Sequence, residues 1–178
     1  MIKRIRQGDR ALFGQLAEKY YSEVFRYCYY QTGSEHTAYD CTQETFYHLM
    51  RFLDTYTEQN HFKAYLLRIA LNVCRDYFRK NARKKSEDYE PLLPEEAAVS
   101  DTASQPSPEN QVITRTLIQN GLNMLPETQR EVIILFYYHG YRQREIAQIT
   151  GVSLSTVKTR LRAGIGKLQE FFRQNGLF

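Results

Sequence analysis

Apolar residues recur every three to four positions along most of this chain, which is the spacing of one face of an α-helix. Residues 1–85 contain three such stretches. Asp9 is a preferred N-cap residue and predicts the start of a helix that Gly33 ends. Ser34 suits the cap of the next helix, and the third is expected over about 62–80. The three apolar stripes are Phe13, Leu16, Tyr20, Val24 and Tyr27; Ala38, Cys41, Thr45, Leu49 and Leu53; and Phe62, Leu66, Ile69, Val73 and Tyr77.

The last third of the chain has the same helical spacing. Ser107 followed by Pro108 suits an N-cap and the first position of a helix. The helices expected here begin at Pro108 and at Pro126, the latter ending before Gly140, and then cover about 142–150 and 153–175. No stretch alternates strictly between apolar and polar residues, so no strand is predicted. The pattern predicts an all-α protein.

Charge divides the chain into three parts. The net charge is +6 over residues 1–85, −7 over 86–110 and +5 over 111–178. The acidic segment holds four of the five prolines and few large aliphatic residues, so it cannot build a core. We therefore predict two small helical domains, an N-terminal bundle (1–85) and a C-terminal helix-turn-helix domain (111–178). A flexible, acidic, Pro-rich linker (86–110) joins them, and it can span at most roughly 80 Å.

Composition excludes several classes of protein. The chain has no apolar run long enough for a membrane span, and its N-terminus lacks the apolar region of a signal peptide, so a cytoplasmic location is expected. Cys28, Cys41 and Cys74 form no C-x-x-C pair and are interpreted as buried residues in a reducing compartment. The four histidines have no metal-ligand spacing, and no phosphate-binding loop is present. We expect no metal, no cofactor and no catalytic residue.

The stretch "YRQREIAQITGVSLSTVKTRLRAG" has the features of a helix-turn-helix. Ala147 is small enough for close helix approach, Gly151 suits a turn that needs a positive φ, and Val157 falls where the second helix packs back. The opposite side of that helix carries Ser155, Lys158, Thr159 and Arg162. This side has no acidic residue, whereas a merely solvated helix face usually mixes charges. The composition therefore favours a helix that enters the major groove of DNA.

The expected N-terminal domain contains a second basic helix and one acidic patch. "FKAYLLRIALNVCRDYFRKNARKK" places aromatic residues among cations, a combination suited to single-stranded DNA, although Tyr77 lies on the apolar stripe and fits the core better. "DCTQETF" places Asp40, Gln43 and Glu44 on one face of a helix. Spacing alone favours a solvated face for this patch. Since carboxylates repel DNA, a functional patch here would face a protein.

These three motifs together resemble the bacterial RNA polymerase sigma factors of the extracytoplasmic-function (ECF) group. "DCTQETFYHLM" resembles the helix that docks on the polymerase clamp, and "FKAYLLRIALNVCRDYFRK" resembles the helix that melts and holds the −10 element. "LPETQREVIILFYYHGYRQREIAQITGVSLSTVKTRLRAGIGKL" resembles the domain that recognises the −35 element. The resemblance covers nearly the whole chain, with the motifs in the family's order. It implies sigma region 2 over 1–85 and sigma region 4 over 111–178.

The resemblance also implies partners and a role for particular residues. The partners are core RNA polymerase (its clamp and flap regions), promoter DNA that is double-stranded at −35 and single-stranded at −10, and an anti-sigma factor, often membrane-bound in this family. Asn72 matches the residue beside the flipped-out −10 base, and an amide suits the recognition of a base edge. The implied sites are Asp40, Gln43, Glu44, Phe46 and Met50 for the polymerase; Arg68, Asn72, Arg75, Arg79 and Lys80 for the −10 element; and Ser153, Ser155, Thr156, Lys158, Thr159 and Arg162 for the −35 element.

The sequence departs from the family pattern at two places. Tyr65 stands where the family usually has Trp, which leaves its role as a packing or base-contacting residue open. Gly164 and Gly166 interrupt the last predicted helix, and each lowers helix propensity by roughly 1 kcal/mol relative to Ala. We therefore expect that helix to bend or fray around Gly164.

Two other functions are compatible with a DNA-binding chain. One is a helix-turn-helix regulator whose N-terminal module senses a ligand or dimerises; it would bind duplex DNA without polymerase, at paired half-sites. The other is a nuclease or phosphoryl-transfer enzyme with a DNA-binding tail. That enzyme needs clustered carboxylates for metal ions, but the densest acidic cluster lies in the Pro-rich linker.

Overall fold

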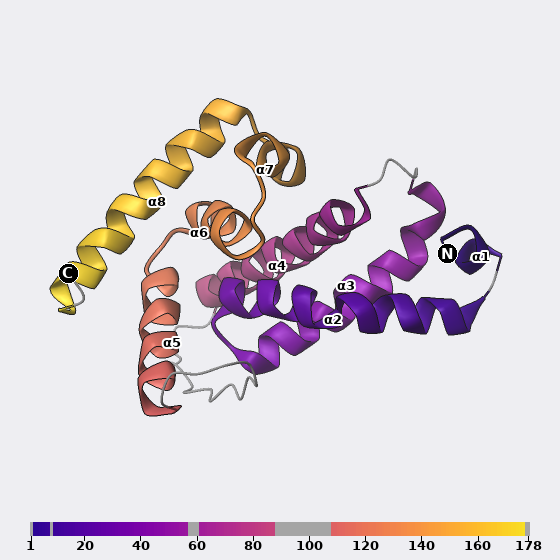
Figure 1. Cartoon of the computed structure of the whole chain (residues 1–178), viewed down its shortest axis with the longest axis horizontal. Coiled ribbons are helices and arrows are strands. Elements are labelled where there is room, and N and C mark those ends of the chain that lie inside the picture. The colour runs from indigo at the N-terminus through magenta and orange to yellow at the C-terminus, as the bar shows by residue number, and fades with distance from the viewer. Residues whose placement is uncertain (1, 8, 57–60, 88–107, 177–178) are drawn as a thin grey trace. The chain divides into compact units, whose positions relative to one another are not determined.

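A computed structural model describes residues 2–7, 9–56, 61–87 and 108–176 (Figure 1). Every regular element within these ranges is helical, so the predicted all-α class is confirmed. The chain divides into two compact units, Met1–Tyr29 with His36–Leu92 and Tyr30–Glu35 with Leu93–Phe178. Most of the predicted linker lies outside the described residues. No described helix is both long enough and apolar enough to cross a lipid bilayer.

Local capping signals set the ends of the helices before the linker. The elements are α1 (Ile2–Arg6), α2 (Arg10–Thr32), α3 (Glu35–Phe52), the 3₁₀ turn η1 (Leu53–Thr55) and α4 (Phe62–Glu87). Asp9 caps α2 as predicted, because its Oδ1 accepts a hydrogen bond of 3.2 Å from the amide of Leu12. Gly33 follows α2 with a φ of 72°, also as predicted. The sequence pattern did not predict α1, and α4 continues past Lys80 to Glu87.

The core of the first unit is formed by the inward faces of α2, α3 and α4. Tyr21 of α2 stacks on Phe46 of α3, and Tyr20 of α2 packs on Phe62 of α4. The predicted stripe of α3 is buried throughout, from Ala38 to Leu53. The three cysteines, one on each of these helices, are free thiols and buried, as the sequence predicted.

The second unit is built around its longest helix. Its elements are α5 (Pro108–Asn123), α6 (Glu127–Ile133), the π-helical turn η2 (Ile134–Tyr138), α7 (Gln143–Thr150) and α8 (Leu154–Gln174). Helix α8 packs against α5, α6 and α7 (Figure 1). The core is mainly aliphatic and includes Leu122, Leu125, Val132, Ile133, Ile134, Leu135, Ile146, Ile149, Val157 and Leu161. The helix predicted to open at Pro126 is present, but its last turn widens into η2, where the amide of His139 bonds to the carbonyl of Ile134.

Helix α8 does not fray at Gly164, so the expectation of fraying there is wrong. Helix α8 is continuous through this residue, and Gly164 is buried. A β-carbon at this position would lie 3.1 Å from Cγ1 of Ile133 in α6. The glycine is therefore a close-packing position between two helices. Gly166, by contrast, is exposed and has no neighbouring atom within 4 Å of such a β-carbon.

Candidate nucleic-acid interface

Helices α7 and α8 form the helix-turn-helix that the sequence predicts. Gly151 ends α7 with a φ of 74°. Ser153 then caps α8, because its Oγ accepts a hydrogen bond of 3.1 Å from the amide of Thr156. Ile146 and Val157 are fully buried between the two helices. The Gly151 turn, the Ser153 cap and the buried Ile146 and Val157 side chains together fix α8 so that its other side faces solvent.

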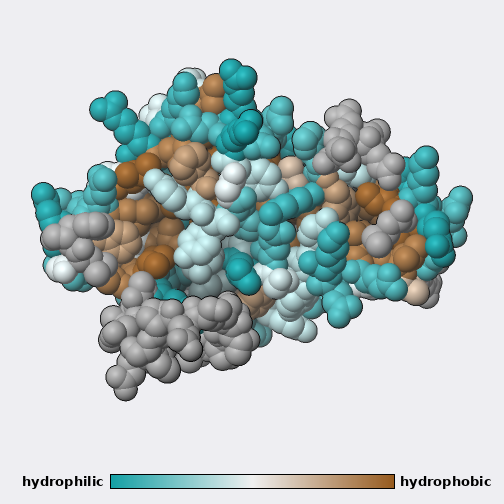
Figure 2. Space-filling view, viewed as in Figure 1, coloured by the Kyte–Doolittle hydropathy of each residue, from teal (hydrophilic) through white to brown (hydrophobic). Residues whose placement is uncertain are grey.

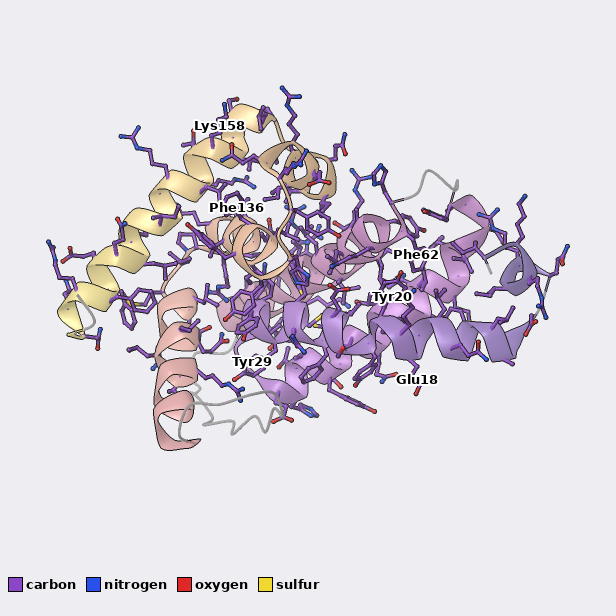
Figure 3. All side chains as sticks on the ribbon, viewed as in Figure 1. Glu18, Tyr20, Tyr29, Phe62, Phe136 and Lys158 are labelled. Atoms are coloured by element: carbon purple, nitrogen blue, oxygen red, sulfur yellow. The ribbon has the colours of Figure 1, made fainter. Side chains whose placement is uncertain are left out.

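The solvent side of α8 carries the predicted residues. Ser153, Ser155, Lys158, Thr159 and Arg162 are exposed and Thr156 is half-buried. Hydrophilic residues cover the surface over the first turns of α8 in Figure 2, and Figure 3 labels Lys158 on these turns.

The hydroxyl groups at this end of α8 partly bond to one another. Ser153 Oγ lies 2.8 Å from Ser155 Oγ and 2.7 Å from Thr156 Oγ1, and Thr159 Oγ1 donates to the carbonyl of Ser155. No carboxylate among the described residues forms an ion pair with Lys158 or Arg162. These two cations are therefore available to phosphates or guanine edges, while Ser153 and Thr156 chiefly order the helix start.

Two cations at the start of α7 were not among the predicted site residues. Arg142 precedes α7 and Arg144 lies in its first turn, and both are exposed. The first helix of a helix-turn-helix crosses the DNA backbone, so these positions suit phosphate contacts. The motif "YRQRE" could have indicated them, since both arginines lie within four residues before Ile146, the first apolar residue of this helix.

Two hollows flank Arg162 on α8. A hollow of about 820 Å³ lies between α5 and α8 and is lined mainly by apolar groups, including Gly121, Met124, Ala163 and Phe171. A second hollow of about 490 Å³ lies toward η2, beside Phe136 and Ile165. Arg162 and Gly166 line both hollows. The end of the proposed recognition face thus adjoins apolar surface suited to a protein partner.

The basic helix α4 aligns four of its five predicted −10 residues. In an α-helix, Arg68, Asn72, Arg75 and Arg79 fall within a stripe about 60° wide. Lys80 lies about 100° away from Arg79 and is not part of this stripe. Asn72 is exposed between the arginines, and Arg79 also forms an ion pair with Asp76. Buried residues of α4 such as Leu66 and Ala70 lie on the opposite side.

Two tyrosines of α4 serve packing. The ring of Tyr65 lies 4.8 Å from that of Tyr56, and its hydroxyl donates to the carbonyl of Phe52 at 3.3 Å. The hydroxyl of Tyr77 lies 3.4 Å from Thr37 Oγ1, which joins α4 to α3. Both side chains are half-buried. Tyr77 therefore packs against α3, which agrees with its place on the apolar stripe.

The predicted acidic patch on α3 is exposed, with one exception. Asp40, Gln43 and Glu44 face solvent, and Met50 is 56% exposed. Phe46 is only 8% exposed. Its ring stacks on Tyr21 of α2 at 6.2 Å, so it holds α3 against α2 and is not part of the exposed surface.

Other side chains on the outer face of α3 were missed by the sequence analysis. Tyr39 and Tyr47 are about half exposed. Their spacing of three or four residues from Gln43 and Met50 could have placed them on the same helix face. His36 and His48 lie 3.6 Å from Asp40 and 3.0 Å from Glu44. This mixture of carboxylates, aromatic rings and an exposed methionine is suited to a protein partner. No cluster of three His, Cys, Asp or Glu side chains in the described residues has the arrangement of a metal site.

Comparisons with known proteins agree with this arrangement. The family described as sigma-70 region 2 matches residues 16–84, and the family described as sigma-70 region 4 matches residues 115–168. The ECF RNA polymerase sigma factor SigW of Bacillus subtilis is 31% identical over 97% of this chain and 95% of its own length.

Two solved structures have the same fold. The sigma factor RpoE of Bartonella quintana, solved with the anti-sigma factor NepR, superposes with a TM-score of 0.76 at 22% identity, over 90% of this chain and 96% of that one. CnrH, solved with the cytosolic domain of CnrY, superposes with a TM-score of 0.71 at 24% identity, over 98% and 96% of the two chains.

Proposed function

Because this chain belongs to the ECF RNA polymerase sigma factors of the sigma-70 family, we propose that it binds core polymerase, recognises −10 and −35 promoter elements and promotes DNA melting. Proteins of this family direct transcription initiation at promoters and are initiation factors rather than catalysts. The main support for polymerase binding and promoter recognition is that the chain has two basic surfaces and an acidic patch. The basic surfaces are the stripe on α4 and the acid-free side of α8, and the acidic patch lies on α3.

The acidic patch on α3 is the proposed docking surface for the polymerase clamp. Asp40, Gln43, Glu44 and Met50 are exposed on one helix and can be reached by a protein. Carboxylates repel DNA phosphates, so this surface is suited to a protein rather than to the promoter. Phe46 contributes indirectly, by fixing α3 on α2.

The stripe on α4 is the proposed −10 surface. The Asn72 side chain can both donate and accept hydrogen bonds, which suits the edge of an unstacked base. Arg68, Arg75 and Arg79 flank it and would hold the backbone, with Lys80 approaching from a neighbouring face. Unstacking a base costs a few kcal/mol, and capture of the unstacked base by the protein offsets this cost, so we propose melting without nucleotide hydrolysis by this chain.

The exposed side of α8 is the proposed −35 surface. Lys158 and Arg162 would contact base edges and phosphates, and the Ser and Thr hydroxyls would add contacts near the helix start. The free amides at that start also favour a phosphate. Arg142 and Arg144 would contact the backbone beside it. For the flap region of the polymerase we propose the same unit, where the hollow between α5 and α8 offers apolar surface.

Two weak DNA contacts become effective when one polymerase holds both units. Each unit alone has few contacts, but tethered sites bind with a high effective concentration. An acidic linker avoids DNA, which is compatible with a path through the polymerase. We also propose an anti-sigma factor as a partner, because RpoE and CnrH were each solved with a bound protein and RpoE's partner is an anti-sigma factor. The site of action would be the cytoplasm, where bacterial promoters lie.

Run-off transcription with purified core polymerase and a library of promoters tests this proposal. We expect promoter-specific transcripts only when the protein is added. Binding to duplex promoter DNA by the protein alone, with no transcripts, would instead indicate a helix-turn-helix regulator. Metal-dependent cleavage of the template would indicate a nuclease.

A further inference from the structure

Arg6 of the short N-terminal helix α1 binds the backbone at the end of η1. Its Nε and Nη2 donate to the carbonyl oxygen of Leu53 at 3.1 and 2.9 Å, and Nη2 also donates to the carbonyl of Tyr56. Ile2, on the same helix, is buried. Arg6 thus joins the start of the chain to a segment about fifty residues later.

The two carbonyl groups that Arg6 binds lie where a helix ends. The carbonyl of Leu53 also accepts a hydrogen bond of 3.2 Å from the amide of Tyr56, so the guanidinium adds a second donor to it. A cation at a helix C-terminus also complements the helix dipole. The guanidinium is planar with several fixed donors, so it can bind two carbonyls at once, whereas an ammonium group acts as a point charge. Arg6 is exposed, but its guanidinium is bonded to backbone carbonyls of the same domain.

Tyr56 connects the backbone that Arg6 binds to the first turn of α4. The Tyr56 side chain is 7% exposed, and its ring lies 5.6 Å from Phe62 and 4.8 Å from Tyr65. Phe62 also packs on Tyr20 of α2 at 5.3 Å, and Figure 3 labels both rings. An ion pair between Lys63 and Glu23 adds a polar contact to the same turn. The backbone held by Arg6 is therefore packed directly against the start of the helix that carries Asn72.

We propose that Arg6 is a positioning residue for promoter opening: by holding the carbonyls of Leu53 and Tyr56 it fixes the start of α4, and with it the −10 surface. This inference rests on the proposed function. It assigns no contact between Arg6 and DNA. If Arg6 positions α4, loss of its guanidinium impairs the melting of duplex DNA more than it impairs docking on polymerase, because docking uses the outer face of α3.

The test compares three full-length variants, each assembled with core polymerase. Arg6→Gln removes the guanidinium and one positive charge, and Arg6→Lys keeps the charge without the planar donors. Lys3→Gln is the matched control, because Lys3 is an exposed cation on the same helix with no hydrogen bond or ion pair among the described residues. Promoter opening is measured by permanganate oxidation of unpaired thymines, on a duplex promoter and on the same promoter with the −10 region already unpaired.

We expect Arg6→Gln and Arg6→Lys to lower opening of the duplex promoter by at least about tenfold, because each change disrupts the charge-assisted hydrogen bonds to the two carbonyls. Transcription from the unpaired promoter and affinity for polymerase should stay within about twofold of wild type. Lys3→Gln should behave as wild type on both templates.

Three results would overturn the inference. Arg6→Gln could open the duplex promoter as well as wild type, or lose polymerase affinity in step with opening, as general destabilisation would cause. Lys3→Gln could lose as much opening as Arg6→Gln, which would show that only net charge matters. Failure of the wild-type protein to open any promoter would instead refute the proposed function, so the two failures are distinguishable.

Discussion

A β-carbon added to Gly164 would lie 3.1 Å from Cγ1 of Ile133, which places this glycine at the contact between α8 and α6. Ile133 is buried and has little room to move. The second glycine of the same helix, Gly166, has open space around it. The two residues therefore offer a matched pair with equal helix propensity and different surroundings.

Gly166→Ala should raise the free energy of unfolding by about 0.5–1 kcal/mol, because alanine favours the helix and meets nothing. Gly164→Ala should lack this benefit, and Gly164→Val should lower stability by about 1–3 kcal/mol through overpacking. Urea unfolding followed by circular dichroism measures each value. Equal stabilisation by alanine at both positions would contradict the close packing of Gly164.

The contrast between Phe46 and Met50 predicts separate effects on stability and docking. Phe46→Ala removes a buried ring and should lower stability by about 3–5 kcal/mol. Met50→Ala removes an exposed side chain, so stability should change by no more than about 0.5 kcal/mol while affinity for core polymerase falls. Thermal unfolding and fluorescence anisotropy with labelled protein measure the two quantities. If Met50→Ala binds polymerase as wild type does, Met50 is not part of the docking surface.

Asn72→Ala should impair open-complex formation more than polymerase binding. The amide is exposed among arginines and has no packing role that its removal would disturb. Permanganate reactivity of promoter thymines reports opening, and anisotropy reports binding to polymerase. An equal loss of both would argue against a role for Asn72 at the −10 base.

Arg162→Ala should weaken use of the −35 element by about 1–3 kcal/mol if the guanidinium recognises a base. Arg173→Ala is the control, since Arg173 lies at the far end of α8 and pairs with Glu170. Transcription from promoters with each −35 position substituted would show where recognition relaxes. An unchanged −35 preference in Arg162→Ala would remove this residue from the recognition face.

The three thiols should react slowly with disulfide reagents in the folded protein. Hydrogen bonds with Cys28 and Cys41, together with burial, raise the pKa of the Cys74 thiol well above its usual value, so little thiolate exists near pH 7. The hydrogen bond with Cys74 lowers the pKa of the Cys41 thiol, so burial is what protects Cys41, and Cys28 is buried as well. Titration with Ellman's reagent should show fast reaction of all three only after denaturation. Rapid modification of Cys74 in the native state would contradict this environment.

The sequence alone determined most of the helices and several of their ends, because these depend on local chemistry; it missed α1 and the last turns of α4. Asp9 and Ser153 accept hydrogen bonds from amides three residues later, and Gly33 and Gly151 adopt the left-handed conformation that glycine favours. The apolar stripes and the acid-free side of α8 likewise follow from helical spacing. These patterns were sufficient to identify the family and to select exposed residues on α3, α4 and α8.

Only the tertiary structure decided which residues contact partners distant in the sequence. It turned Phe46 inward against Tyr21, placed Gly164 against Ile133, and brought the exposed Arg6 within hydrogen-bond distance of the Leu53 carbonyl. It also widened the last turn before His139 into a π-helical turn. Each of these depends on the shape of a neighbouring element, which residue spacing within one helix does not contain.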